Sequence, residues 1–256
     1  MSQSISFIIG SPLEQFQIQS LIPFTGPFNL DFSLTNSAII TLLAIWIYLT
    51  FTQLALKTQT LVPNRTQNII EILYEQVQNM VVENIGTSGR RFFPFAFTTF
   101  TLILLLNLFG MIPYVFSVTA HVIITFSFSL AIWIAVTLLG LSNFKVNFLS
   151  MFMPPGSPLI LAPLLVFIEL LSYTARAISL GVRLAANITS GHILLAIISG
   201  FAWKMFTLGG FLTIMSIFPV LILFFLSVLE LAVAFIQAYV FTLLACIYLN
   251  DGLHLH

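Results

Sequence analysis

Six ionisable side chains stand within or at the end of long apolar stretches in the last hundred residues, and these are Glu169, Arg176, Arg183, His192, Glu230 and Asp251. An ionisable group at the centre of a membrane helix costs about 2.5–3.5 kcal/mol on insertion scales, so each group either reaches a surface or has a task. Carboxylates and imidazoles can exchange protons, whereas an arginine does not lose its proton in a protein. The chemistry that this set can perform is therefore proton transfer, with fixed positive charges along the path.

The spacing places several of these residues on one face of a helix. Glu169, Arg176 and Arg183 are seven residues apart, so at about 100° per residue each lies about 20° from the last. Asn187 follows Arg183 by four residues and joins the same stripe. An internal ion pair explains Glu169 and Arg176 as well as a functional role does. Arg183 has no acid three or four residues away, which indicates a carboxylate partner on another chain.

Other polar residues of the apolar stretches carry weaker signals. Glu230 and Gln237 are again seven residues apart, whereas His192 lies nine residues beyond Arg183 and faces another side of its helix. Glu230, in mid-helix, is more easily explained by function than by packing. For His192, a hydrogen-bonded packing role is as good an explanation as proton transfer. Asn107 stands in an earlier apolar segment, where an asparagine more often bonds a neighbouring helix than an ion.

The composition is that of a membrane protein. Of the 256 residues, 59% are hydrophobic and 6% are charged, whereas soluble domains carry about 25% charged residues. A net charge of zero gives no basic surface for nucleic acid. The single cysteine excludes an internal disulfide or a cysteine metal cluster, and the four scattered histidines have no metal-ligand spacing. We therefore predict an all-α, multi-pass membrane protein that holds no metal.

Hydropathy predicts about five membrane helices and one surface helix within a single domain, residues 1–256. The apolar segments are residues 37–56, 92–116, 120–142, 159–203 and 211–249, with a kink expected at Pro113 and a hairpin joint at 117–119. Residues 66–86 place apolar side chains on one face and polar ones, glutamates among them, on the other. This pattern predicts an amphipathic helix that lies against the membrane surface or a protein partner.

The last two segments are too long for ordinary spans. Residues 159–203 correspond to about 67 Å of helix and residues 211–249 to about 58 Å, whereas the hydrocarbon core is about 30 Å thick. Either each segment breaks into two spans, or both lie roughly 60° from the membrane normal. The turn between them is expected over Trp203, Lys204, Gly209 and Gly210, and the strongest kink in the second segment at Pro219.

Basic residues predict the orientation, because they are enriched on the inner side of membranes. Five fall on one face and Lys204 alone on the other, the five being Lys57, Arg65, Arg90, Arg91 and Lys145. The N-terminus is then outside and the C-terminus inside. Residues 1–36 lack the basic residues of a secretory signal or a transit peptide, which is compatible with synthesis in a bacterium or inside an organelle.

The segment from Glu169 to His192, ELLSYTARAISLGVRLAANITSGH, resembles the signature of the subunit a family of F-type ATP synthases. Shorter matches at 11–16, 111–114, 119–121 and 230–240 extend the resemblance over nearly the whole chain. Gly191-His192 resembles the mitochondrial branch, and the N-terminal segment resembles the fungal form, in which a short leader is removed in some members. The resemblance thus implies cleavage of residues 1–10, and it favours a tilted hairpin over residues 159–249 that faces a ring of subunits.

The resemblance also implies a role for each buried charge. In this family, subunit a is the stator against which a ring of c-subunits turns, and it supplies two offset proton half-channels. Arg183 matches the arginine that faces the ring carboxylates and separates the half-channels. His192 and Glu230 match residues of the intermembrane-space half-channel, and Glu169 and Asp251 match acids of the matrix half-channel. The supporting polar positions are Asn187, Gln237, Arg176 and Asn107.

The implied location is the mitochondrial inner membrane, with the N-terminus in the intermembrane space and the C-terminus in the matrix. The implied partners are the ring of c-subunits, other membrane-sector and peripheral-stalk subunits, and the bilayer; protons are the transported ion and no cofactor is expected. Two alternatives stay open. A self-contained proton-coupled transporter or channel predicts an internal repeat or discontinuous helices, and the sequence shows neither. A non-conducting scaffold predicts that Glu230→Gln and His192→Leu leave proton flux intact.

Overall fold

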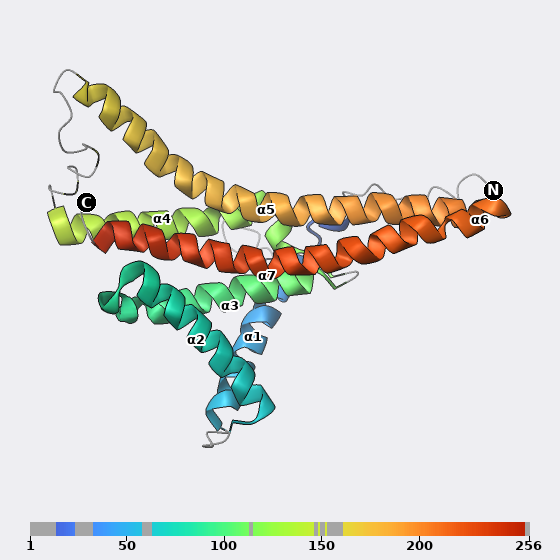
Figure 1. Ribbon diagram of the computed structural model, residues 1–256, viewed down its shortest axis with the longest axis horizontal. Helices are drawn as coiled ribbons and strands as arrows, with labels where there is room; N and C mark the ends of the chain where they lie inside the picture. Colours follow the sequence, from blue (N-terminus) through green and yellow to red (C-terminus); the bar gives the residue numbers. More distant parts are fainter. Residues whose placement is uncertain are drawn as a thin grey trace.

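The protein is a bundle of helices, two of them exceptionally long (Figure 1). The computed structural model describes residues 14–23, 33–57, 63–112, 115–145, 148, 152 and 161–253. Within them, five helical segments are long and apolar enough to cross a membrane. They contain α1 (Asn36–Lys57), α3 (Phe93–Gly110), α4 (Val122–Phe144), α5 (Ala162–Leu208) and, joined end to end, α6 (Phe211–Met215) and α7 (Ile217–Leu253). The prediction of an all-α membrane protein with about five spans is confirmed.

The two long segments are continuous helices rather than pairs of short spans. Helix α5 has 47 residues and α7 has 37, which correspond to about 70 Å and 55 Å at 1.5 Å per residue. Figure 1 shows them side by side over much of their length, with the first part of α5 leaning away from α7. Of the two arrangements that the sequence left open, the structure therefore contains the long hairpin.

The hairpin turn is tighter than the sequence predicts. Helix α5 continues through Trp203 and Lys204 to Leu208, so the expectation that these two residues belong to the turn is wrong. The chain reverses at Gly209 and Gly210, whose φ angles of 72° and 63° lie in the left-handed region that glycine adopts without strain. Two consecutive glycines are sufficient for the reversal, so the polar and aromatic residues before them remain helical.

A short break separates α6 from α7 at Ser216. Pro219 explains its position, because a proline ring clashes with the carbonyl four residues earlier, here that of Met215, the last residue of α6. Within α7 the proline occupies the first turn, where its missing N–H leaves no intrahelical bond unmade. The kink predicted from Pro219 is thus a break just before it.

The connection between α3 and α4 differs from the prediction. Helix α3 ends at Gly110, six residues before the predicted end at 116, and a 3₁₀ turn, η4 (Val118–Ala120), precedes α4. At Gly110 the returning chain passes close by, since a Cβ there would lie 3.0 Å from the Cβ of Ser117. Pro113, at which a kink was expected, lies outside the described residues, as do residues 1–10 with the expected cleavage site.

Helix α2 (Arg65–Ile85) is the predicted amphipathic helix. The second half of its apolar face packs against the other helices. The residues that are buried there, in a core shared with α3, α4, α5 and α7, are Val77, Met80, Val81 and Ile85. Ile69 and Ile72, nearer its start, are about half exposed. The partner of the second half of this face is therefore the chain's own bundle. A 3₁₀ turn, η3 (Thr87–Phe92), links α2 to α3.

A small antiparallel pair holds the N-terminal segment to the start of α1. Strand β1 (Ser20–Ile22) follows the 3₁₀ turn η1 (Glu14–Phe16) and pairs with β2 (Leu34–Thr35), so that Ser20 lies opposite Thr35. Because β2 leads directly into α1, the segment before β1 has a fixed position against the bundle.

Candidate functional site

The long hairpin brings His192 of α5 next to Glu230 of α7. Nδ1 of His192 lies 3.6 Å from Oε1 of Glu230, and the two side chains are 15% and 5% exposed. Both carboxylate oxygens of Glu230 and Nε2 of His192 are buried without a hydrogen-bond partner among the described residues. Buried polar atoms normally have a partner, so these groups are expected to bond water. The pair is suited to passing protons between its members and that water.

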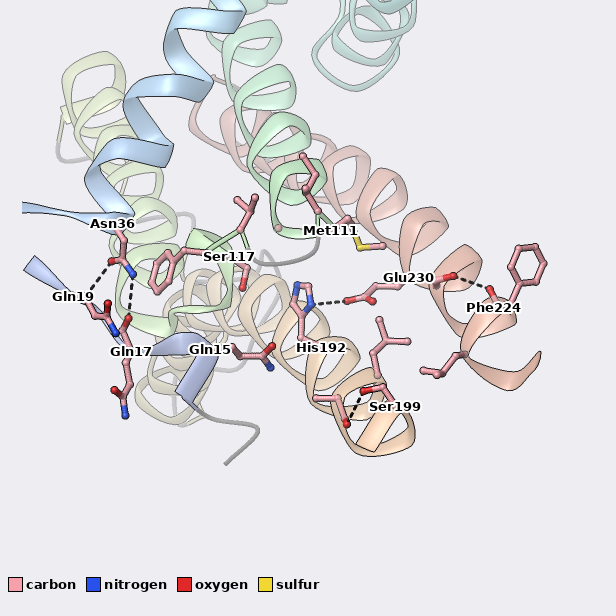
Figure 2. Close-up of a pocket in the computed structure, with 18 residues that line it drawn as sticks. Gln15, Gln17, Gln19, Asn36, Met111, Ser117, His192, Ser199, Phe224 and Glu230 are labelled. Atoms are coloured by element: carbon pink, nitrogen blue, oxygen red, sulfur yellow. Dashed lines mark hydrogen bonds and ion pairs between the residues drawn. The ribbon is translucent and has the colours of Figure 1, made fainter. Parts of the chain in front are cut away.

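A cavity of about 860 Å³, here called the larger cavity, opens beside this pair (Figure 2). Its wall includes His192 and Glu230, the end of α3, and residues of the N-terminal segment. A second cavity of about 430 Å³ is lined by Asn187, Ser190 and, again, Glu230. Glu230 therefore borders both cavities and can receive a proton on one side and release it toward the other.

Gly191 allows the Glu230 carboxylate to approach α5. A Cβ at position 191 would lie 2.7 Å from Oε1 of Glu230 and 3.0 Å from its carboxyl carbon, closer than such atoms normally come. Any other residue at this position would displace the carboxylate. Gly191 is thus a site residue, although its sequence pattern indicates only the branch of the family.

Asn187 and Gln237 join the hairpin further from its turn. Nδ2 of Asn187 donates to Oε1 of Gln237 at 3.0 Å. Gln237 is buried, and its own amide nitrogen has no acceptor among the described residues. The two residues, which spacing assigned to separate helices, therefore form a direct polar bridge between α5 and α7. Along α5, this bridge lies between Arg183 and His192.

Arg183 lies on the same stripe of α5 as Arg176 and Asn187, both of which contact α7. Its neighbours Leu180, Gly181 and Leu184 are buried, whereas Arg183 is exposed. Its guanidinium donates only a long hydrogen bond, 3.4 Å, to Oγ of Ser179, and the ion pairs that the described residues form do not include it. Arg183 is thus an exposed arginine on an apolar helix, and it has no ion-pair partner among the described residues. This is what the sequence predicts for a group that meets another subunit.

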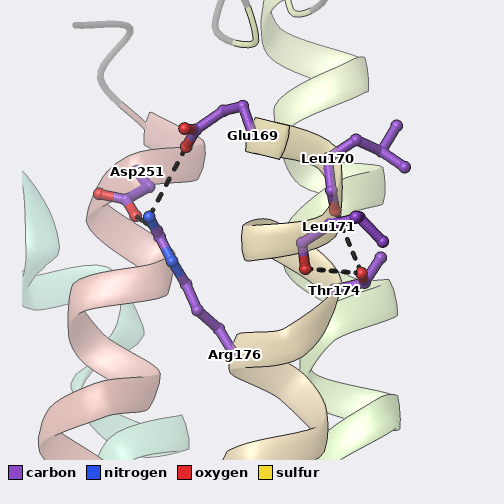
Figure 3. A network of polar contacts seen from close by, with 6 residues as sticks. All are labelled: Glu169, Leu170, Leu171, Thr174, Arg176 and Asp251. Atoms are coloured by element: carbon purple, nitrogen blue, oxygen red, sulfur yellow. Dashed lines mark hydrogen bonds and ion pairs between the residues drawn. The ribbon is translucent and has the colours of Figure 1, made fainter. Parts of the chain in front are cut away.

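A second charged cluster lies at the other end of the stripe (Figure 3). Arg176 of α5 is 3.7 Å from Oε1 of Glu169 and 3.2 Å from Oδ2 of Asp251 at the end of α7. The ion pair that spacing allows between Glu169 and Arg176 is present, whereas no spacing pattern indicates the closer contact to Asp251. One arginine therefore holds two acids from both arms of the hairpin near one another.

Asn107 takes no part in either cavity's wall. It is 1% exposed, and its Nδ2 donates to the carbonyl of Ala234 at 3.2 Å, which ties α3 to α7. This is the helix-bridging role that is commonest for a buried asparagine in a membrane helix.

Sequence reasoning missed several polar residues that line the larger cavity, namely Gln15, Gln17, Gln19, Asn36, Ser199 and Ser227. Two of them carried a signal: Ser199 follows His192 by seven residues, and Ser227 precedes Glu230 by three, so each shares a helix face with a proton-exchanging group. The glutamines alternate with other residues in a segment that carried no strong pattern of its own.

Comparisons with known proteins identify the family of the chain. A family model described as ATP synthase A chain matches residues 36–250. A protein of Chondrus crispus named ATP synthase subunit a is 48% identical over 250 residues, which is 98% of both chains. Proteins of the same name from Marchantia polymorpha and Metridium senile are each 49% identical, over 96% and 95% of this chain and 99% and 97% of their own. The chain therefore belongs to the ATP synthase A chain family.

Proposed function

We propose that this protein is the proton-conducting stator subunit of the membrane sector of ATP synthase. It supplies two half-channels through which protons load onto, and leave, carboxylates on a rotating ring of c-subunits, and this drives ATP synthesis. The observation that carries the proposal is the position of Arg183. It is exposed, has no ion-pair partner among the described residues, and stands on α5 between the His192–Glu230 pair and the Glu169–Arg176–Asp251 cluster.

The fixed charge of Arg183 explains why protons must travel by way of the ring. A guanidinium cannot release its proton, so it repels a proton in the gap and favours the ionised form of a nearby ring carboxylate. A proton that crosses 100 mV releases about 2.3 kcal/mol, and a direct leak would lose that free energy. A ring carboxylate that passes Arg183 would release its proton toward Glu169 and Asp251 and be reloaded from the His192–Glu230 side.

The length of α5 keeps the two half-channels apart. Glu169 and His192 are 23 residues apart on one helix, which is about 35 Å. In a steeply tilted hairpin most of that distance runs along the membrane plane, so the half-channels are laterally offset. A proton can then move from one to the other only with the ring as it turns.

The proposed location is the mitochondrial inner membrane, with the N-terminus in the intermembrane space and the C-terminus in the matrix. The excess of basic residues in the segments assigned to the inner face, five against Lys204 alone on the other, supports this orientation. The proposed partners are the ring of c-subunits, which would lie along the exposed face of the hairpin, and peripheral-stalk subunits. Protons are the proposed cargo, and no cofactor is required.

Replacement of Arg183 in the assembled complex tests the proposal. We expect Arg183→Ala to abolish ATP synthesis and ATP-driven proton pumping, because the ring carboxylates lose the charge that separates the half-channels. The matched control is Lys204→Ala, which removes an exposed base from the same helix near its end and should leave both rates unchanged. Normal coupled transport in Arg183→Ala would disprove the stator role. Proton flux through the purified chain alone in liposomes would instead indicate a self-contained channel.

A further inference from the structure

We infer that residues 15–19 of the N-terminal segment contribute a wall of the larger cavity and that Phe16 is a positioning residue for His192. The inference rests on the proposed function, since it assigns this segment to the half-channel that contains His192 and Glu230. It concerns residues outside the long hairpin, on a part of the chain that precedes the first membrane helix.

The segment is anchored by the first residue of α1. The backbone N–H of Asn36 donates to the carbonyl of Gln19 at 3.1 Å, and its side-chain Nδ2 donates to the carbonyl of Gln17 at 3.1 Å. The backbone N–H of Gln19 donates in return to Oδ1 of Asn36 at 3.4 Å. With the β1–β2 pair beside them, these bonds fix the backbone on both sides of residue 18. The position of this wall is therefore set by backbone and side-chain hydrogen bonds to the start of α1.

Phe16 contacts the imidazole that pairs with Glu230. The ring centroids of Phe16 and His192 are 6.2 Å apart with an interplanar angle of 65°, an edge-to-face arrangement that aromatic rings favour. Two other groups border the imidazole: Oε1 of Glu230 lies 3.6 Å from Nδ1, and a Cβ at Gly110 would lie 3.6 Å from Nε2. Among the described residues, the imidazole is thus bordered by η1, α3 and α7, and Phe16 is the residue that contacts it as a ring.

The side chains with which this segment and Asn36 line the larger cavity are polar but uncharged. Gln15, Gln17, Gln19 and Asn36 line the larger cavity, and Figure 2 shows Gln17, Gln19 and Asn36 together on one side of it, with His192 and Glu230 on another. Amides can bond water as donors and acceptors and do not titrate in the ordinary pH range. Among the described residues that line this cavity, His192 and Glu230 are the titratable ones. These amides can therefore hold water without competing for protons, and among the described lining residues the protons can be taken up at His192 and Glu230.

The test is the pH profile of ATP-driven proton pumping, measured per assembled complex in native membrane vesicles. Phe16→Ala removes the ring contact, and an aromatic pair of this kind corresponds to roughly two- to tenfold in a rate or an equilibrium. We expect a loss of that size and a displaced midpoint of the pH profile. Phe16→Tyr keeps the ring and should behave as wild type. The matched control is Ile18→Ala, on the same segment but 54% exposed and absent from the cavity wall.

The outcomes separate this inference from the proposed function. If Phe16→Ala has the wild-type rate and pH profile per complex, or lowers only the number of assembled complexes, the inference is wrong. An equal shift of the profile in Ile18→Ala would also overturn it, since the effect would then belong to the segment and not to the ring contact. Glu230→Gln and Arg183→Ala are measured alongside. If these two variants also pump protons at the wild-type rate, the proposed function is wrong. If they do not pump but Phe16→Ala pumps as wild type does, only the inferred role of Phe16 is wrong.

Discussion

At the scale of single residues, Gly191 leaves room for the Glu230 carboxylate because glycine has no Cβ. Gly191→Ala would put that carbon 2.7 Å from Oε1, and the end of a flexible side chain is what must give way. We expect the carboxylate to move off His192 while the helices keep their packing. A misplacement of about 1 Å can cost about a hundredfold in a transfer step, so proton pumping should fall between tenfold and a hundredfold.

Measurement of pumping together with the amount of subunit in the membrane checks this prediction. Gly200→Ala is the control. Gly200 is also on α5, but a Cβ there would have no neighbouring atom of the described residues within 4 Å. Normal pumping by Gly191→Ala at normal abundance would show that the close approach of Glu230 to α5 is not required for proton transfer.

The residues of the site were largely predictable, but their partners across helices were not. Charges that stand seven apart in apolar sequence predict the stripes on α5 and α7. Which member of one stripe meets which of the other depends on where the hairpin turns. A turn expected anywhere over Trp203–Gly210 leaves that register undetermined by several residues, whereas reversal at Gly209–Gly210 pairs His192 with Glu230 and Arg176 with Asp251.

At the scale of elements, α4 and α5 approach each other closely at Gly181. A Cβ there would lie 2.6 Å from Oγ of Ser129 and 2.8 Å from Cα of Phe126, and a backbone atom cannot move aside as a side chain can. We expect Gly181→Ala to push the two helices apart and to cost about 1–3 kcal/mol of stability, as overpacking commonly does.

The expected readout differs from that of Gly191→Ala. Because the collision involves the backbone, Gly181→Ala should lower the amount of subunit that assembles, as quantified by immunoblotting of the purified complex, with Gly200→Ala again as the control. Wild-type abundance would show that α4 and α5 can separate at no cost, contrary to the tight packing of Leu180 and Leu184 beside Gly181, which are 1% and 2% exposed.

Helix existence was well predicted and helix ends were not. Apolar runs identify each span, and the proline in the first turn of α7 identifies the break before it, since length and sequence chemistry decide both locally. The end of α3 at Gly110 depends instead on Ser117 folding back against it, and the burial of Val77 and Val81 depends on α2 meeting α7 and α3. These are tertiary contacts that hydropathy does not report.

At the scale of the whole molecule, the fold predicts which parts face each side of the membrane. The end of α2 packs with the end of α7, since Ile85 and Leu249 belong to one core cluster, whereas the α5–α6 turn lies at the opposite end of the hairpin (Figure 1). With basic residues on the inner side, the end of α2 should face the matrix and the turn the intermembrane space. Single cysteines at exposed positions test this: Glu83→Cys near the end of α2 and Thr207→Cys near the turn.

The native cysteine does not interfere, because Cys246 is 4% exposed and can be replaced by alanine, which is also small and apolar. In mitochondria whose outer membrane has been ruptured, a membrane-impermeant maleimide should label Thr207→Cys. It should reach Glu83→Cys only after the inner membrane is inverted. Labelling of both from one side would place α2 and the hairpin turn on the same face, and exchange of the two patterns would invert the protein. Either result would contradict the assignment of His192 and Glu230 to the intermembrane-space half-channel, because the larger cavity that they share is built from the N-terminal segment and the half of the hairpin nearest the turn.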